Sequence, residues 1–166
     1  MASDAKHWEA VEEVAELLRD GQYEEALRAL RHAIREDPEN PYAYNQLGSA
    51  LLDLGQLDPA ADAFAAALQL APRFLAARVG LSHALRLHGE LDGAVAQAEQ
   101  ALRQFPGDAD ALRVAGLAHA ASGQLDEARQ RLGAYLGTDP ELGSQPELRA
   151  VLAMLGLDGE GEPTGS

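Results

Sequence analysis

Apolar side chains recur along this chain at the three- and four-residue spacing of an amphipathic helix. In the run that begins near residue 41, one face of a helix is formed by Tyr44, Leu47, Gly48 and Leu51. A second run of the same kind, over 57–68, follows Gly55. Because glycine tolerates the left-handed conformation at which many helices end, Gly55 predicts a turn between two helices.

This helix–turn–helix pattern repeats at a constant step of 34 residues. In each copy a glycine ends the first helix, an alanine lies early in the second, and a proline closes the copy because proline cannot continue a helix interior. The matching columns are Gly21, Gly55, Gly89 and Gly123, then Ala26, Ala60, Ala94 and Ala128, then Pro38, Pro72, Pro106 and Pro140. This regular spacing predicts four copies, over 7–40, 41–74, 75–108 and 109–142.

Small residues in the pattern indicate where helices contact one another. We expect Gly48 and Ala60 to lie where the two helices of the second copy cross, since a bulky side chain there would push the helices apart. Phe64 is then expected to fill the space beside this crossing. One hairpin cannot bury its apolar face alone, whereas stacked copies can, and the pattern therefore predicts a solenoid.

The pattern resembles the tetratricopeptide repeat (TPR) family, which has a 34-residue signature. The residues that carry the resemblance are clearest in the second copy, at Tyr44, Leu47, Gly48, Leu51, Gly55, Ala60, Phe64, Ala67 and Pro72. The resemblance implies an all-α fold, a right-handed α-solenoid of four TPR helix–turn–helix repeats. It also implies a protein that binds other proteins.

The two ends of the chain depart from the repeat. Residues 1–6 are expected to form an N-terminal tail, and 143–156 to form a C-terminal capping helix that covers the last repeat. Ser144 and Glu147 have the Ser-x-x-Glu spacing of a capping box at the start of that helix. The segment 157–166 is rich in glycine and acidic residues without an apolar pattern, so we expect it to be disordered.

The net charge of the chain limits the classes of molecule that it can bind. The formal net charge is −14, and a strongly acidic surface repels nucleic acid and anionic lipid. No apolar run is long enough for membrane insertion. The chain has no cysteine, which excludes disulfides and thiolate metal sites. The segment Met1 to Lys6 has no apolar core of a signal peptide, so we expect a cytoplasmic protein, with a periplasmic location as the alternative. The acidic charge favours another protein as its partner.

The resemblance also implies where a partner binds, because in this family the first helices of the repeats line a concave groove. The apolar members of the candidate set would form a patch, and the polar members would orient a peptide or an amphipathic helix. The candidate residues are Tyr42, Asn45, Gln46, Ser49, Leu52, Val79, His83, Arg86, Leu87, Asp110, Arg113, Val114 and Leu117. The alternative interpretation is that several of these residues form the core between adjacent repeats.

One TPR subfamily holds the C-terminal carboxylate of chaperones with a clamp of Lys, Asn and Arg. This chain departs from that clamp, because the corresponding positions hold Val11, Ala15, Gln46, Ala76 and Gly80. The sequence therefore argues against a role as a chaperone-tail co-chaperone.

No pattern in the chain indicates catalysis, a cofactor or a metal site. The histidines do not pair at i and i+4, and no phosphate loop or nucleophile motif is present. Adjacent acidic residues such as Glu12 and Glu13 point to different faces of a helix, so they form no catalytic dyad. We interpret His119 as a core histidine with a hydrogen-bond partner, and Trp8 as a cover for the first hairpin rather than a partner anchor.

These features favour a non-enzymatic adaptor or scaffold that binds a peptide or helix of a partner protein in its concave groove. Two alternatives stay open at the level of the sequence. One is a secretion-type chaperone that shields an apolar client segment, and the other is a self-assembling structural scaffold, which would make the protein a homo-oligomer.

Overall fold

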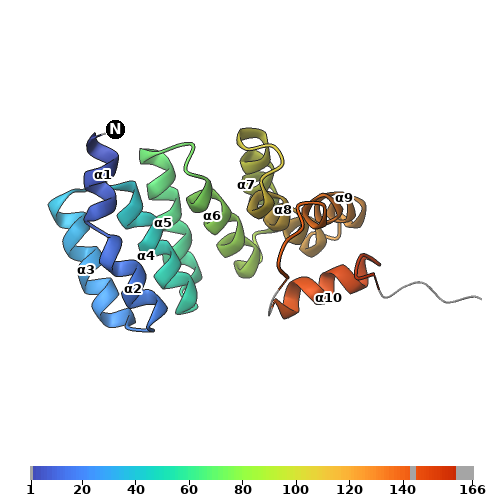
Figure 1. Cartoon of the computed structure of the whole chain (residues 1–166), viewed down its shortest axis with the longest axis horizontal. Coiled ribbons are helices and arrows are strands. Elements are labelled where there is room, and N and C mark those ends of the chain that lie inside the picture. The colour runs from blue at the N-terminus through green and yellow to red at the C-terminus, as the bar shows by residue number, and fades with distance from the viewer. Residues whose placement is uncertain (1, 143–144, 160–166) are drawn as a thin grey trace, which may run out of the picture.

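The computed structural model describes residues 2–142 and 145–159, and in these residues the chain forms ten α-helices and no strand. Figure 1 shows the helices stacked side by side in chain order, which confirms an all-α solenoid. None of the described helices is long and apolar enough to cross a membrane. The helices are α1 Ala2–Glu9, α2 Glu12–Arg19, α3 Tyr23–Glu36, α4 Pro41–Asp53, α5 Leu57–Leu70, α6 Leu75–His88, α7 Leu91–Gln104, α8 Ala109–Ala121, α9 Leu125–Leu136 and α10 Pro146–Met154.

The glycine column marks the turn inside each copy, as the sequence predicts. The φ angle is 72° at Gly21, 71° at Gly55, 92° at Gly89 and 76° at Gly123. After α4, the backbone N–H of Gln56 donates to the carbonyl of Leu51 at 2.8 Å, which closes the helix end around the glycine. A residue with a Cβ is strained at this φ, so the column sets where each first helix stops.

Phe64 of α5 joins the second copy to the third. A Cβ on Gly48 of α4 would lie 2.7 Å from the Phe64 ring, and a Cβ on Gly80 of α6 would lie 2.5 Å from it. The ring therefore occupies a notch made by two glycines from neighbouring first helices. The sequence predicts the contact with Gly48, but the contact with Gly80 emerges only from the stacking of the copies.

The first copy differs from the expected hairpin, because its first helix is broken into α1 and α2. The chain bends at Val11, whose φ and ψ of −128° and 3° are not helical and whose side chain is fully buried. This bend lets Val11 and Val14 pack against α3 and α4, while Trp8 reaches Tyr42. The helical segment also begins earlier than expected, since α1 includes residues 2–6 that were predicted to form a tail.

Asn40 ties the start of α4 to this N-terminal segment. Its side-chain oxygen accepts from the backbone N–H groups of Tyr42 and Ala43, which makes it the N-cap of α4. Its side-chain amide donates to the backbone carbonyl of His7 at 2.9 Å. The side chain is fully buried, so these bonds are made without competition from water.

Asn40→Ala is expected to lower the free energy of unfolding by about 1 kcal/mol, because it removes an N-cap and leaves a buried carbonyl without its donor. Urea denaturation followed by circular dichroism measures the change. Asn40→Ser is the matched control, since its hydroxyl can keep the cap while the bond donated to His7 is lost. An Ala variant no less stable than the Ser variant would show that the cap contributes nothing.

The helix α10 covers the C-terminal end of the array (Figure 1). Leu148, Leu152 and Leu155 are buried in one cluster with Leu117 of α8 and Leu132 of α9. The described helix is shorter than the predicted range 143–156, and Ser144 of the proposed capping box lies outside the described residues.

The first residue of the expected tail contacts the core. A turn at Gly156, with φ of 70°, brings Leu157 back onto the α8–α10 cluster, whereas Asp158 and Gly159 are exposed. The rest of the expected tail, 160–166, lies outside the described residues.

Candidate functional site

A pocket of about 390 Å³ lies on the face formed by the first helices of the second, third and fourth copies. We call it the first-helix pocket. Phe64 contributes to its lining from α5. The remaining lining residues are Asn45, Ser49, Leu52 and Asp53 of α4, Leu75, Ala76, Val79, Gly80 and His83 of α6, and Asp110, Arg113 and Val114 of α8.

The structure brings most of the candidate partner-binding residues together in this pocket. Side chains from α4, α6 and α8 therefore share one cavity, and they include apolar, hydroxyl, amide and ionisable groups. The candidate residues that line it are Asn45, Ser49, Leu52, Val79, His83, Asp110, Arg113 and Val114. Their binding of a partner stays a prediction.

Three candidate residues are buried, where a groove surface was expected. Gln46 and Val114 are almost fully covered by neighbouring helices, although Val114 still contributes to the pocket lining. Leu117 is 4% exposed, because α10 folds over it and places it in the cluster with Leu148 and Leu152. The alternative interpretation, core between adjacent elements, is correct for these three positions.

Tyr42 lies outside the pocket, on an edge of aromatic side chains. Its ring lies 5.6 Å from that of Trp8 and 5.2 Å from that of Phe74, in edge-to-face geometry with both. Trp8 is 46% exposed, so it packs against the second copy and still presents part of its ring to solvent. Leu87, the last apolar candidate, is exposed and does not line the pocket.

Arg86 of α6 forms a bidentate ion pair with Glu147 of α10, which is far away in the sequence. Its Nη1 contacts Oε1 of Glu147 in α10, and its Nη2 contacts Oε2 at 3.1 Å. The hydrogen bonds from Arg86 and its positive charge lower the pKa of Glu147, with further lowering from His83 and Arg113, although burial opposes them. Glu147 is therefore a carboxylate that Arg86 above all keeps ionised.

His83 lines the pocket beside this ion pair. Its Nδ1 lies 3.2 Å from Nη2 of Arg86, and because a guanidinium only donates, Nδ1 accepts and the proton of the neutral ring lies on Nε2. Burial and the positive charges of Arg86 and Arg113 lower the pKa of His83, against an opposing effect of Glu147. His83 therefore offers the site a neutral ring at pH 7.

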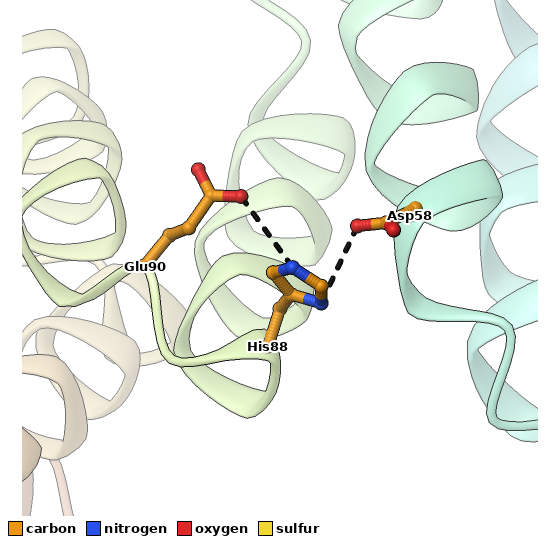
Figure 2. A group of neighbouring side chains, drawn as sticks. All are labelled: Asp58, His88 and Glu90. Carbon is orange, nitrogen blue, oxygen red and sulfur yellow. Dashed lines mark ion pairs between the residues drawn. The ribbon is translucent and has the colours of Figure 1, made fainter.

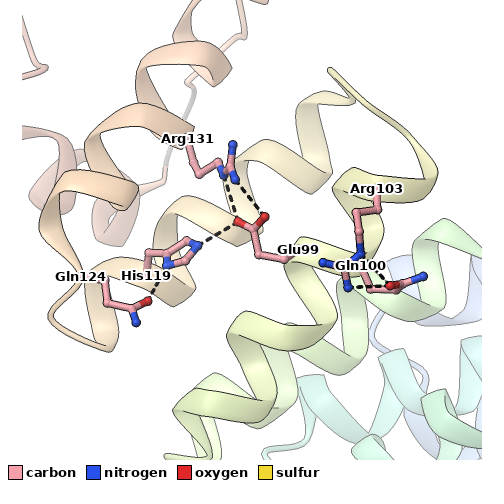
Figure 3. Close-up of polar contacts among 6 residues, drawn as sticks. All are labelled: Glu99, Gln100, Arg103, His119, Gln124 and Arg131. Carbon is pink, nitrogen blue, oxygen red and sulfur yellow. Dashed lines mark hydrogen bonds and ion pairs between the residues drawn. The ribbon is translucent and has the colours of Figure 1, made fainter.

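A second polar network joins the third copy to the fourth (Figure 3). The carboxylate of Glu99 in α7 accepts from Nε and Nη2 of Arg131 in α9, both at 2.9 Å. It also contacts Nε2 of His119 in α8 at 2.8 Å, and Nδ1 of His119 lies 2.6 Å from Oε1 of Gln124. His119 is buried, which confirms that it is a core histidine with hydrogen-bond partners.

The pKa of Glu99 follows from two opposing effects. Burial raises it, whereas the hydrogen bonds from Arg131 and His119, together with their positive charges, lower it more, and the net result is a pKa below the usual 4.5. Through these hydrogen bonds, Glu99 connects the second helix of the third copy to both helices of the fourth. Glu99 does not line the first-helix pocket.

Sequence reasoning missed a third polar cluster, because its members come from two turns. Asp58, His88 and Glu90 each offer a ligand atom within 4.8 Å of the others, and all three are exposed. Figure 2 shows Asp58 and Glu90 on different nitrogens of His88, at 3.3 Å and 3.8 Å. A metal ion takes only one ring nitrogen, so carboxylates on both nitrogens of His88 suit two polar contacts to the ring better than a metal site.

Two family models, both described as tetratricopeptide repeat, match this chain, one over residues 12–73 and the other over 85–155. The chain belongs to the tetratricopeptide repeat family. Proteins built from TPR repeats are typically binding scaffolds without catalytic activity, and this chain is accordingly a protein–protein interaction scaffold.

Similar proteins share the repeat architecture. MamA from Desulfovibrio magneticus RS-1 superposes with a TM-score of 0.73 at 26% identity, covering 92% of this TPR chain and 87% of that one. TTC0263 from Thermus thermophilus, a thermophilic TPR protein, gives 0.72 at 28% identity over 91% and 81%. YrrB, described as a TPR protein with an unusual peptide-binding site, gives 0.69 at 26% identity over 85% and 70%.

One relative is similar by sequence over a limited region. The CTR9 homolog of Arabidopsis thaliana is 32% identical over 124 residues, which is 74% of this chain. The chain spans 11% of the length of that protein.

Proposed function

We propose that this protein is an adaptor that holds a peptide or an amphipathic helix of a partner protein in the first-helix pocket. The observation that carries the proposal is the pocket itself, which gathers apolar and hydrogen-bonding side chains from the first helices of three successive copies.

The composition of the pocket suits a peptide. Leu52 and Val79 offer apolar contact, while Asn45 and Ser49 offer groups that can bond to a peptide backbone. The side-chain oxygen of Asn45 is buried without a hydrogen-bond partner in the described structure, so a donor on a bound segment would satisfy it. The peptide-binding site named for YrrB is in keeping with this proposal.

Ala76→Gln tests the pocket. Ala76 lines the pocket and is exposed, so glutamine adds bulk without a charge and without disturbing the core. Short random peptides displayed on phage are selected on the immobilised full-length chain, and the affinities of the selected peptides are measured by calorimetry. We expect the variant to bind them about tenfold more weakly or worse, a loss of about 1.4 kcal/mol or more.

Ala96→Gln is the matched control, because Ala96 is an exposed alanine on the second helix α7 and does not line the pocket. It is expected to bind the peptides as the native chain does. The proposal fails if selection yields no peptide, or if both variants bind equally well.

A further inference from the structure

Three basic side chains meet at one end of the first-helix pocket. His83 and Arg113 line the pocket, and Arg86 reaches them through its hydrogen bond to His83. The positive charges of Arg86 and Arg113 act together on the carboxylate of Glu147. In a chain of net charge −14, two arginines beside the predicted binding face offer a place for an anionic group.

The two partners of the Arg86–Glu147 pair are buried to very different degrees. The Arg86 side chain is 7% exposed, whereas that of Glu147 is 54% exposed. A buried guanidinium needs an acceptor, because an unpaired buried charge is costly. A carboxylate that already faces water can return to water easily. Arg86 must therefore keep a carboxylate, but that carboxylate need not be Glu147.

The apolar anchor of α10 is separate from this ion pair. Leu148, Leu152 and Leu155 are buried against α8 and α9, and they hold the helix without help from Glu147. Glu147 can therefore leave Arg86 by a change of its own side chain, while α10 stays in place. In addition, Nε of Arg86 is buried without a hydrogen-bond partner in the described structure, so this guanidinium can donate one bond more than Glu147 accepts.

We propose that the segment bound in the first-helix pocket places an aspartate or glutamate side chain on Arg86 and Arg113, and that Glu147 competes for that place from within the chain. This inference rests on the proposed function of the pocket. A side-chain carboxylate exchanges for Glu147 on Arg86, and Arg113, which is bonded to Asp110 at 3.3 Å, turns a free donor toward the incoming charge. Apolar neighbours in the same segment cover Leu52 and Val79.

The test uses the full-length chain and a peptide obtained by the phage selection, synthesised in two versions with glutamate or glutamine at its acidic position. We expect selection to enrich one acidic position, and the glutamate version to bind about tenfold more tightly than the glutamine version. Glu147→Gln removes the competing charge, so it is expected to tighten binding of the glutamate version about fivefold while leaving the glutamine version unchanged.

Arg113→Gln should have the opposite effect. It is expected to weaken binding of the glutamate version about fivefold to tenfold and to change binding of the glutamine version little. Glu127→Gln is the control, because it removes the same charge from an exposed position on α9 and is expected to change neither affinity. Circular dichroism of each variant establishes that the fold is kept.

The outcomes separate this inference from the function on which it rests. Peptides that lose affinity on Ala76→Gln but show no acidic preference, and no response to Glu147→Gln, overturn the inference and leave the pocket as a binding site. Peptides that are indifferent to Ala76→Gln overturn both. A glutamate preference that responds equally to Glu127→Gln and Glu147→Gln reflects net charge, and it also overturns the inference.

Discussion

Phe64→Ala is expected to lower the free energy of unfolding by about 3–5 kcal/mol, because it removes a fully buried ring and leaves a cavity that cannot collapse. The cavity would be lined by Gly48 and Gly80, which have no side chains that could move into it. The ring contacts first helices of two copies, so its loss weakens both the hairpin of the second copy and its junction with the third.

Urea denaturation followed by circular dichroism measures the effect. We also expect the transition to broaden, since a repeat array unfolds as one unit only while the junctions between copies are strong. Phe105→Ala is the control, because Phe105 is half-buried and contacts the Arg73 guanidinium at the edge of the array. A Phe64 variant no less stable than the Phe105 variant would show that the notch is not a structural joint.

Glu99→Gln is expected to cost about 2 kcal/mol of stability at pH 7, because it weakens charge-assisted bonds to Arg131 and His119 together. The Glu99 side chain is 21% exposed, so water replaces these bonds poorly. Glu24→Gln removes an exposed carboxylate of α3 and is expected to change stability by less than about 0.5 kcal/mol.

The effect of Glu99→Gln depends on pH in a defined direction. The folded-state pKa of Glu99 lies below its usual 4.5, so the carboxylate stabilises the fold fully above that value and loses its contribution as pH falls through the lowered pKa. The stability difference between native chain and variant should therefore be constant near neutrality and shrink in acid. A difference that stays the same down to about pH 3 would contradict the role assigned to the ion pair.

The sequence predicts the repeat architecture well because each copy carries its own signals. The glycine column requires a positive φ, and the helix faces follow from the spacing of apolar residues, both of which are local properties. The same local signals place Asn45, Val79 and Arg113 on first helices. Because the copies stack, these residues line one pocket.

The features that the sequence did not predict depend on contacts between distant residues. Leu117 occupies a position of the first-helix face, and only the path of α10 makes it a core residue. The ion pair between Arg86 and Glu147 spans 61 residues, and no periodicity relates the two positions. The break at Val11 likewise reflects packing against α3 and α4, which no local pattern in the first copy encodes.

The junctions between copies differ in how firmly they interlock. Between α5 and α6, the Phe64 ring fills the notch formed by two glycines. Between α7 and α8, the buried apolar residues have small side chains: Ala94, Ala98, Ala115, Ala118 and Val114. The α7–α8 junction has no such ring, but the carboxylate of Glu99 adds hydrogen bonds to His119 and Arg131 across it. The first-helix pocket extends across both junctions, so its shape depends on an apolar ring at one junction and on a titratable carboxylate at the other. Acid that protonates Glu99 should therefore weaken one side of the pocket and leave the other unchanged.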